Sequence, residues 1–141
     1  MKHPIFITNS DQRNLLNLMN REKEFGVTGN AALQDLELEL KRACIRSSAE
    51  IPPDVITMYS KVLLRDLDDG EHITYTLVYP ADADLTAEKV SVLAPVGMAI
   101  LGYREGDILS WAVPAGVVRL QVEKVLYQPE AAGDPKPGRE M

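Results

Sequence analysis

Few residues in this chain have the types and spacing that metal binding requires. The two histidines, His3 and His72, are far apart, and neither has a cysteine or a second histidine at ligand spacing. Four acidic residues crowd one turn, at positions 66, 68, 69 and 71, but their spacing differs from that of a calcium-binding loop. Acidic residues are also common in turns because they cap them. The sequence therefore predicts no metal site and no cofactor.

Covalent catalysis and phosphate binding also lack their usual residues. Cys44 is the single cysteine, and no histidine lies near it in sequence to serve as a base. The segment Gly97–Gly102 is followed by Tyr103, where a phosphate-binding loop would continue with Lys and Ser or Thr. We therefore expect no catalytic residue, and a protein that is not an enzyme.

One pair of acidic residues lies at the end of a predicted helix, where it could contact a partner. Glu22 and Glu24 alternate with Arg21 and Lys23, directly before Phe25. They fall at the end of a predicted helix, and thus at the tip of any hairpin that this helix forms. A charged cluster at a helix end is most often a solvated surface, so the plainest interpretation is structural.

Two helices are predicted to position that tip. Thr8, Asn9 and Ser10 offer N-caps for the first helix, and a glycine-rich break ends it. The second helix repeats apolar residues with the spacing of a coiled-coil seam, at Leu33, Leu36, Leu40 and Ala43. Each helix would have about 16 residues and measure ~24 Å at ~1.5 Å per residue. Residues 1–48 are therefore predicted to form a short antiparallel helical hairpin. Leu38 and Ile45 either pack its base onto the rest of the chain or are partly exposed.

After this hairpin the pattern changes from helical spacing to alternation. Residues 49–54 contain two consecutive prolines and are predicted to form a stiff linker. Alternating apolar residues and Gly- or Pro-containing turns predict strands over 55–66, 72–79, 90–93, 108–113 and 117–127. Pro95 is placed to begin one short helix that runs to Leu101. The fold class is thus α+β, with an antiparallel β domain over 55–129 and a disordered tail over 130–141.

Charge and composition narrow the classes of partner. Residues 1–48 carry seven basic and six acidic side chains, whereas 49–141 carry eight basic and fifteen acidic ones, a net charge of −7. Phosphate would be repelled by this second part, so direct DNA or RNA binding is not expected. No stretch approaches the ~20 apolar residues of a membrane span. We expect a cytoplasmic protein, and a monomer because the hairpin can bury its own seam.

Several short segments follow one another in an order that is informative as a whole. They are Thr57-Met58, Ser60-Lys61-Val62, Asp66-Leu67, Asp69-Gly70-Glu71, Leu77-Val78-Tyr79-Pro80, Ala94-Pro95-Val96-Gly97, Gly106-Asp107 and Tyr127-Gln128-Pro129-Glu130-Ala131. In this order and spacing the chain resembles the Gre transcription factor family, and in particular its short-armed members, the regulators of nucleoside diphosphate kinase.

The resemblance implies a fold, a partner and a contact site. Residues 55–129 would be a Gre carboxy-terminal domain with an FKBP-like fold. The partner would be core RNA polymerase, bound beside its secondary channel through Ala94, Pro95 and Val96. In Gre cleavage factors, acidic residues at the tip of a longer arm help to hold magnesium, so Glu22, Glu24 and Phe25 at this shorter tip are given no catalytic role. Competition with Gre factors without RNA cleavage is expected, and any link to nucleoside diphosphate kinase is expected to be indirect.

Two alternatives remain open from the sequence. An FKBP-like fold could instead serve a peptidyl-prolyl isomerase, whose pocket is lined by aromatic side chains. The aromatic residues of the β domain are Tyr59, Tyr75, Tyr79, Tyr103, Trp111 and Tyr127. A transcript-cleavage factor is the second alternative, and it requires Glu22 or Glu24 to reach the catalytic centre of the polymerase.

Overall fold

The computed structural model describes residues 5–24, 31–113 and 115–134, and the side chains of 22–24, 31–33 and 111–113 are outside this description. In chain order the helices and strands are β1 (Phe6–Ile7), α1 (Asn9–Glu24), α2 (Ala31–Lys41), β2 (Cys44–Ile45), β3 (Lys61–Asp66), β4 (His72–Val78), β5 (Lys89–Ser91), α3 (Pro95–Ile100), β6 (Ile108–Val113), β7 (Gly116–Tyr127) and α4 (Pro129–Ala132). Three short 3-10 helices lie between them, namely η1 (Ser48–Glu50), η2 (Pro80–Asp82) and η3 (Leu85–Ala87). This content confirms the predicted α+β class.

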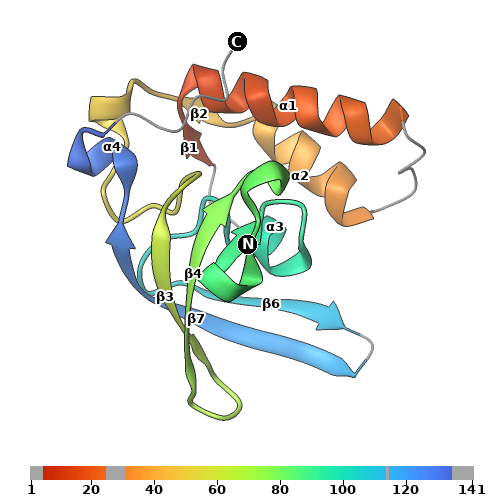
Figure 1. Ribbon diagram of the computed structural model, residues 1–141, viewed down its shortest axis with the longest axis vertical. Coiled ribbons are helices and arrows are strands. Elements are labelled where there is room, and N and C mark those ends of the chain that lie inside the picture. The colour runs from red at the N-terminus through yellow and green to blue at the C-terminus, as the bar shows by residue number, and fades with distance from the viewer. Residues whose placement is uncertain (1–4, 25–30, 114, 135–141) are drawn as a thin grey trace.

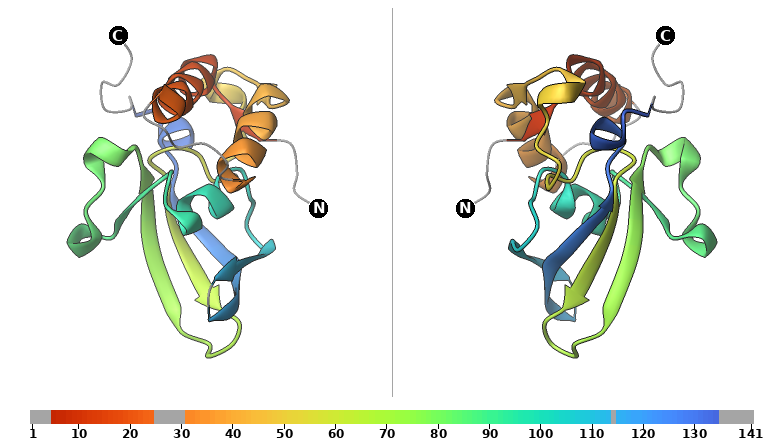
Figure 2. Two further views of the ribbon diagram at one scale, coloured as in Figure 1. Left: turned by 90° about the vertical axis from the view of Figure 1, so that its right-hand side faces the viewer. Right: turned by 90° about the vertical axis from the view of Figure 1, so that its left-hand side faces the viewer.

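Five of the strands form one twisted sheet in the order β5-β4-β3-β7-β6 (Figure 1). Neighbouring strands are antiparallel except β4 and β5, which run parallel with Leu77 opposite Val90. The prediction of a wholly antiparallel sheet is therefore wrong at this edge. The connection from β4 to β5 contains η2 and η3 and stands out to one side of the sheet (Figure 2). It brings the chain back alongside β4 before β5 begins, which is what a parallel pair requires.

The first two helices pack together at the end of the molecule opposite the β6–β7 tip (Figure 1). Their buried apolar residues are Leu15, Leu18, Met19, Leu36 and Leu40. Thr8 caps α1, because its Oγ1 accepts a hydrogen bond from the Asp11 N–H at 3.3 Å. Helix α2 has 11 residues, fewer than predicted. Leu38 and Ile45 are 56% and 38% exposed, which agrees with the alternative of exposure and not with packing of the helices onto the sheet.

A short parallel strand pair that the sequence did not reveal joins these helices to the sheet. In it Phe6 pairs with Cys44 and Ile7 pairs with Ile45. Ile5, just before β1, is buried, and its Cγ1 would lie 2.7 Å from a Cβ added to Gly102. Gly102 also has a φ of +87°, which disfavours other residues. One hydrophobic core therefore extends from the helices into the sheet, and it does not divide at the predicted linker.

The predicted linker, 49–54, is attached to its surroundings. It includes the end of η1 and the buried Ile51. The side-chain amide of Gln128 donates to the carbonyl oxygens of Pro52 and Val55, at 2.8 and 2.7 Å. The strand predicted to begin at residue 55 begins only at Lys61. The intervening 55–60 are all buried in an irregular conformation, so their apolar pattern reflected burial and not strand pairing.

The predicted disordered tail begins too early. Pro129–Ala132 form α4, and Glu130 within it is buried. The Thr57 hydroxyl donates to Glu130 Oε1 at 2.8 Å, and it also lies 2.9 Å from the Ser60 hydroxyl. Low apolar content misled the prediction because this segment is fixed by polar contacts. The described residues include no helix with the length and apolar character to cross a membrane.

Replacing Thr57 with valine tests this polar attachment. Thr57→Val keeps the shape of the side chain but removes the hydrogen bond to the buried Glu130 carboxylate. We expect the free energy of unfolding, measured with urea, to fall by about 1–3 kcal/mol. The matched control is Thr74→Val, on the outer face of β4, which we expect to change stability by less than ~0.5 kcal/mol. Equal effects of the two changes would contradict the role given to Thr57.

Candidate functional site

The three residues predicted to contact a partner form one corner, where β5 turns into α3. Ala94 precedes the helix in an extended conformation, with φ −70° and ψ 152°, and Pro95 occupies the first helical turn. The Ala94 N–H donates to the carbonyl oxygen of Ser91 at 3.0 Å, and the Ser91 hydroxyl accepts from the Leu93 N–H, also at 3.0 Å. These two bonds fix the turn. Proline suits the start of the helix because its φ is already helical and its missing N–H is not needed there.

Gly97 sets the position of this corner against the sheet. A Cβ added to Gly97 would lie 2.0 Å from the carbonyl oxygen of Ser91, far inside contact distance. Helix α3 therefore meets β5 through direct backbone contact, which only glycine permits. The corner can move little relative to β5.

The surface of the corner is apolar and only partly covered. Pro95 is exposed, whereas Ala94 and Val96 are half-buried. Ala94 and Val96 also pack against the core, as do the neighbouring half-buried residues Leu93, Met98 and Ala99. The corner offers no acid, base or nucleophile, so its chemistry suits contact with another macromolecule.

The structure tests the predicted tip only in part. Glu22 and Glu24 lie in the last turn of α1, but their side chains are not among those described, and Phe25 lies outside the described residues. Their role remains a prediction.

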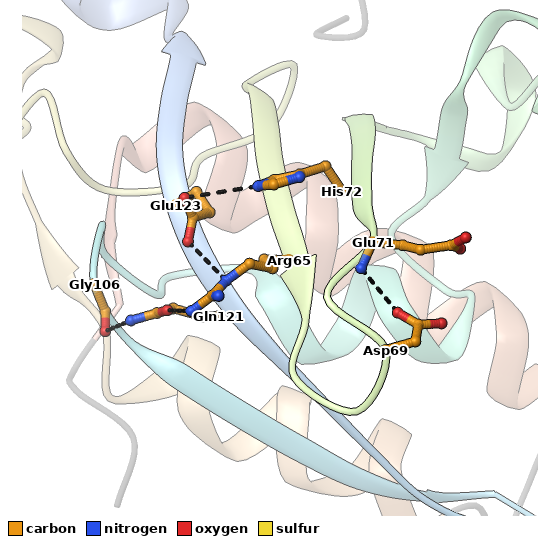
Figure 3. Close-up of polar contacts among 7 residues, drawn as sticks. All are labelled: Arg65, Asp69, Glu71, His72, Gly106, Gln121 and Glu123. Atoms are coloured by element: carbon orange, nitrogen blue, oxygen red, sulfur yellow. Dashed lines mark hydrogen bonds and ion pairs between the residues drawn. The ribbon is translucent and has the colours of Figure 1, made fainter.

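Metal binding has no support in the part of the chain that is described. No group of three or more His, Cys, Asp or Glu side chains there could hold an ion. At the predicted acidic turn, Asp66 Oδ1 accepts from the Asp68 N–H at 2.8 Å. Asp69 Oδ1 accepts from the Glu71 N–H at 2.9 Å (Figure 3). These carboxylates cap the turn, which is the structural alternative that the sequence offered.

The outer face of the sheet carries a polar network that the sequence did not reveal (Figure 3). Glu123 lies 3.1 Å from Arg65 Nε and 3.9 Å from His72 Nε2. The first contact is an ion pair without hydrogen-bond geometry. Arg65 also donates to Gln121 Oε1 at 3.0 Å, and Gln121 donates to the Gly106 carbonyl at 3.4 Å. Because these side chains mostly satisfy one another and face water, the network fits a solvated sheet face.

Two tyrosines that could have lined an isomerase pocket are instead buried in the core. The rings of Tyr59 and Tyr79 have centroids 5.9 Å apart. Tyr79 donates to Asp11 Oδ1 at 3.2 Å, and Tyr59 donates to Asp82 Oδ2 at 2.7 Å. Burial, reinforced by the negative charge of Asp11, raises the pKa of Tyr79 far above its usual range. Tyr79, directly after β4, thus joins the sheet to α1, and Tyr59 joins the irregular segment 55–60 to η2.

Comparisons with known proteins agree with one another. A family model described as "Transcription elongation factor, GreA/GreB, C-term" matches residues 51–127. The regulator of nucleoside diphosphate kinase from Escherichia coli K12 is 42% identical over 135 residues, which cover 95% of this chain and 98% of that protein. Transcription elongation factor GreA from Clostridium botulinum Alaska E43 is 38% identical over 87 residues, 62% of this chain and 54% of that protein.

A solved structure is similar over most of its length. It is described as a prokaryotic transcription elongation factor GreA/GreB from Nitrosomonas europaea, and it is 40% identical to this chain with a TM-score of 0.74. The match covers 89% of this chain and all of that one. Both the sequence and the fold therefore point to the same group of proteins.

Gly97→Ala tests whether backbone contact positions the α3 corner. Alanine normally favours a helix over glycine by up to ~1 kcal/mol. Here the added methyl group meets the Ser91 carbonyl, so we expect the free energy of unfolding to fall by about 2 kcal/mol or more. Urea unfolding measures this, with Ala99→Gly in the same helix as the control for propensity. A stability that rises on Gly97→Ala would contradict the close contact.

Proposed function

Because this chain belongs to the GreA/GreB family of transcription elongation factors, we propose that it is a non-enzymatic regulator that binds core RNA polymerase beside the secondary channel. There it competes with Gre factors and does not stimulate cleavage of the transcript. The observation that carries this proposal is the α3 corner, where Pro95 is exposed on a backbone held rigidly against β5. A rigid apolar contact loses little conformational freedom on binding, which favours recognition of a protein surface.

The proposed contact consists of Ala94, Pro95 and Val96. Pro95 would enter the interface first because it is exposed, and the half-buried Ala94 and Val96 would surround it. The acidic charge of residues 49–141 favours a basic surface on the polymerase and disfavours direct contact with RNA or DNA. The sheet behind the corner corresponds, in this proposal, to the FKBP-like domain of Gre factors.

The absence of cleavage follows, in this proposal, from a short arm. We propose that α1 and α2 form an antiparallel hairpin whose tip carries Glu22, Glu24 and Phe25. The 16 residues of α1 measure ~24 Å, and the 11 residues of α2 span ~16 Å. A tip at this distance stops short of the catalytic centre, so its acids do not take part in metal-assisted cleavage.

The remaining partner proposal follows from a relative's name. The similar Escherichia coli protein is called a regulator of nucleoside diphosphate kinase. We propose that any such link for this chain is indirect and passes through transcription, since the apolar corner already has a partner in the polymerase. An isomerase function has less support, because Tyr59 and Tyr79 are buried in the core.

Pro95→Glu tests the contact with the polymerase. Glutamate is compatible with the first turn of a helix, so the fold should be kept while an apolar contact is replaced by a charge. We expect the affinity for core RNA polymerase, measured by fluorescence anisotropy, to fall at least about tenfold, or ~1.4 kcal/mol. The control is Val117→Glu, which places the same charge at an exposed apolar residue of β7. Equal losses in both variants would contradict the assigned contact.

Backtracked transcription complexes test the second half of the proposal. The protein should lower the rate at which an added Gre factor cleaves the transcript, in proportion to its occupancy, and should cause no cleavage alone. Cleavage by the protein alone that disappears in Glu22→Ala would show that the tip reaches the catalytic centre. That result would replace the proposal with the cleavage-factor alternative.

A further inference from the structure

The two edges of the five-stranded sheet differ in how their backbone groups are used. At one edge, β5 is three residues long and its outward groups are already bonded. Asp84 and Lys89 exchange backbone hydrogen bonds of 2.9 Å in both directions, and the Ser91 carbonyl accepts from Ala94. At the other edge, and within the residues that the structure describes, β6 pairs only with β7. The first edge is thus closed to a further strand, and the second is open.

Within its own six residues, the open strand lacks charged residues and proline, two of the features that normally prevent pairing between sheet edges. Natural proteins protect edges with charged residues, proline, bulges or very short strands. The sequence of β6, ILSWAV, has six residues and contains no charged residue and no proline. Beside the edge, Ile108 on β6 and Val117 on β7 are each 59% exposed. A strand of this kind is a template for strand addition.

The register of β6 shows which of its residues face the open edge. At its start, Gly106 donates to the Val122 carbonyl, and the Val122 N–H donates to the Asp107 carbonyl. With Gly106 at φ +91°, this is a G1 bulge that makes Asp107 and Val122 the hydrogen-bonded pair. Hydrogen-bonded and non-bonded pairs alternate along an antiparallel ladder. The residues that turn their N–H and C=O groups to the open edge are therefore Ile108, Ser110 and Ala112.

We propose that this edge binds a second copy of the same chain, with β6 pairing antiparallel to β6 about a two-fold axis at Ser110. In this register Ser110 faces Ser110 of the other copy, and Ile108 faces Ala112. Asp107, the acid nearest to the strand, faces Val113, so no like charges meet across the contact. A closed two-fold pair also uses the same patch on both copies, so it leaves no free edge for further growth.

The arrangement extends the sheet continuously from one copy to the other. The α1 and α2 helices lie at the end of the molecule opposite the β6–β7 tip (Figure 1), so pairing through β6 leaves these helices uncovered. The prediction of a monomer rested on the helices alone and did not consider the sheet edge.

Each copy has a net charge of −6, so repulsion between the two copies opposes pairing at low salt and is screened at high salt.

Site-specific crosslinking tests the register directly. In a Cys44→Ala background, Ser110→Cys places two thiols across the axis at a Cα separation of about 5.5 Å, within reach of a disulfide. The matched control, Arg119→Cys, is on the neighbouring strand and pairs with Ser110 in its own chain. Across the dimer its two copies would be three strand spacings apart, ~14 Å. We expect oxidised dimer to form at least about tenfold faster with Ser110→Cys than with Arg119→Cys.

Light scattering on the otherwise unchanged chain gives an independent measurement. We expect the mass to rise from 15.6 kDa towards twice that value with concentration and with salt. Ser110→Pro removes an N–H that β7 does not use, and it should abolish the rise, whereas Ser110→Ala should keep it. Three results would each overturn the proposal. The chain could stay monomeric, or crosslinking could be equally fast at positions 110 and 119. Alternatively, the dimer could survive Ser110→Pro while circular dichroism shows the native sheet.

Discussion

The contact between Ile5 and Gly102 determines how the helices are held on the sheet. The space next to the Gly102 Cα is filled by Ile5, and Gly102, with its positive φ, is the third residue of the turn from Ile100 to Tyr103 that follows α3. Residues at the two ends of this contact are far apart in sequence, yet they bring β1, β2 and α3 into one core. Apolar residues of α1 and α2, among them Leu15, Met19 and Leu40, belong to the same core.

Polar contacts have a different role from the apolar core. Tyr79 and Asp11 join the sheet to α1, while Gln128 and Glu130 join the C-terminal segment to 52–57. A buried hydrogen bond adds only about 0.5–1.5 kcal/mol net, but its loss leaves a desolvated group and costs more. Such contacts therefore select one arrangement of elements among several that would bury similar apolar area.

The sequence predicted those parts of the fold that depend on local signals. The Asp-Gly turn and the alternation predicted the first residue of β4, and Pro95 predicted the first residue of α3. Strand β6 has the predicted bounds at both ends. The parts that it did not predict depend on contacts between distant segments. The β1–β2 pair has two residues in each strand, too few for a periodic signal, and the parallel direction of β5 is set by the path of the η2–η3 connection.

The candidate site shows the same division between local and distant information. Ala94, Pro95 and Val96 were selected through a family resemblance, and the structure adds that Gly97 holds them against Ser91. The close approach itself could not be read from the sequence, because a glycine there also fits a helix in ordinary packing. The open edge at β6 likewise becomes visible only when the strand order is known, since an uncharged strand in the middle of a sheet would have the same sequence. The proposed contact corner, held by backbone contact, and a sheet edge without charged residues are thus both consequences of topology. They lie on different strands, so binding at one would not require the groups of the other.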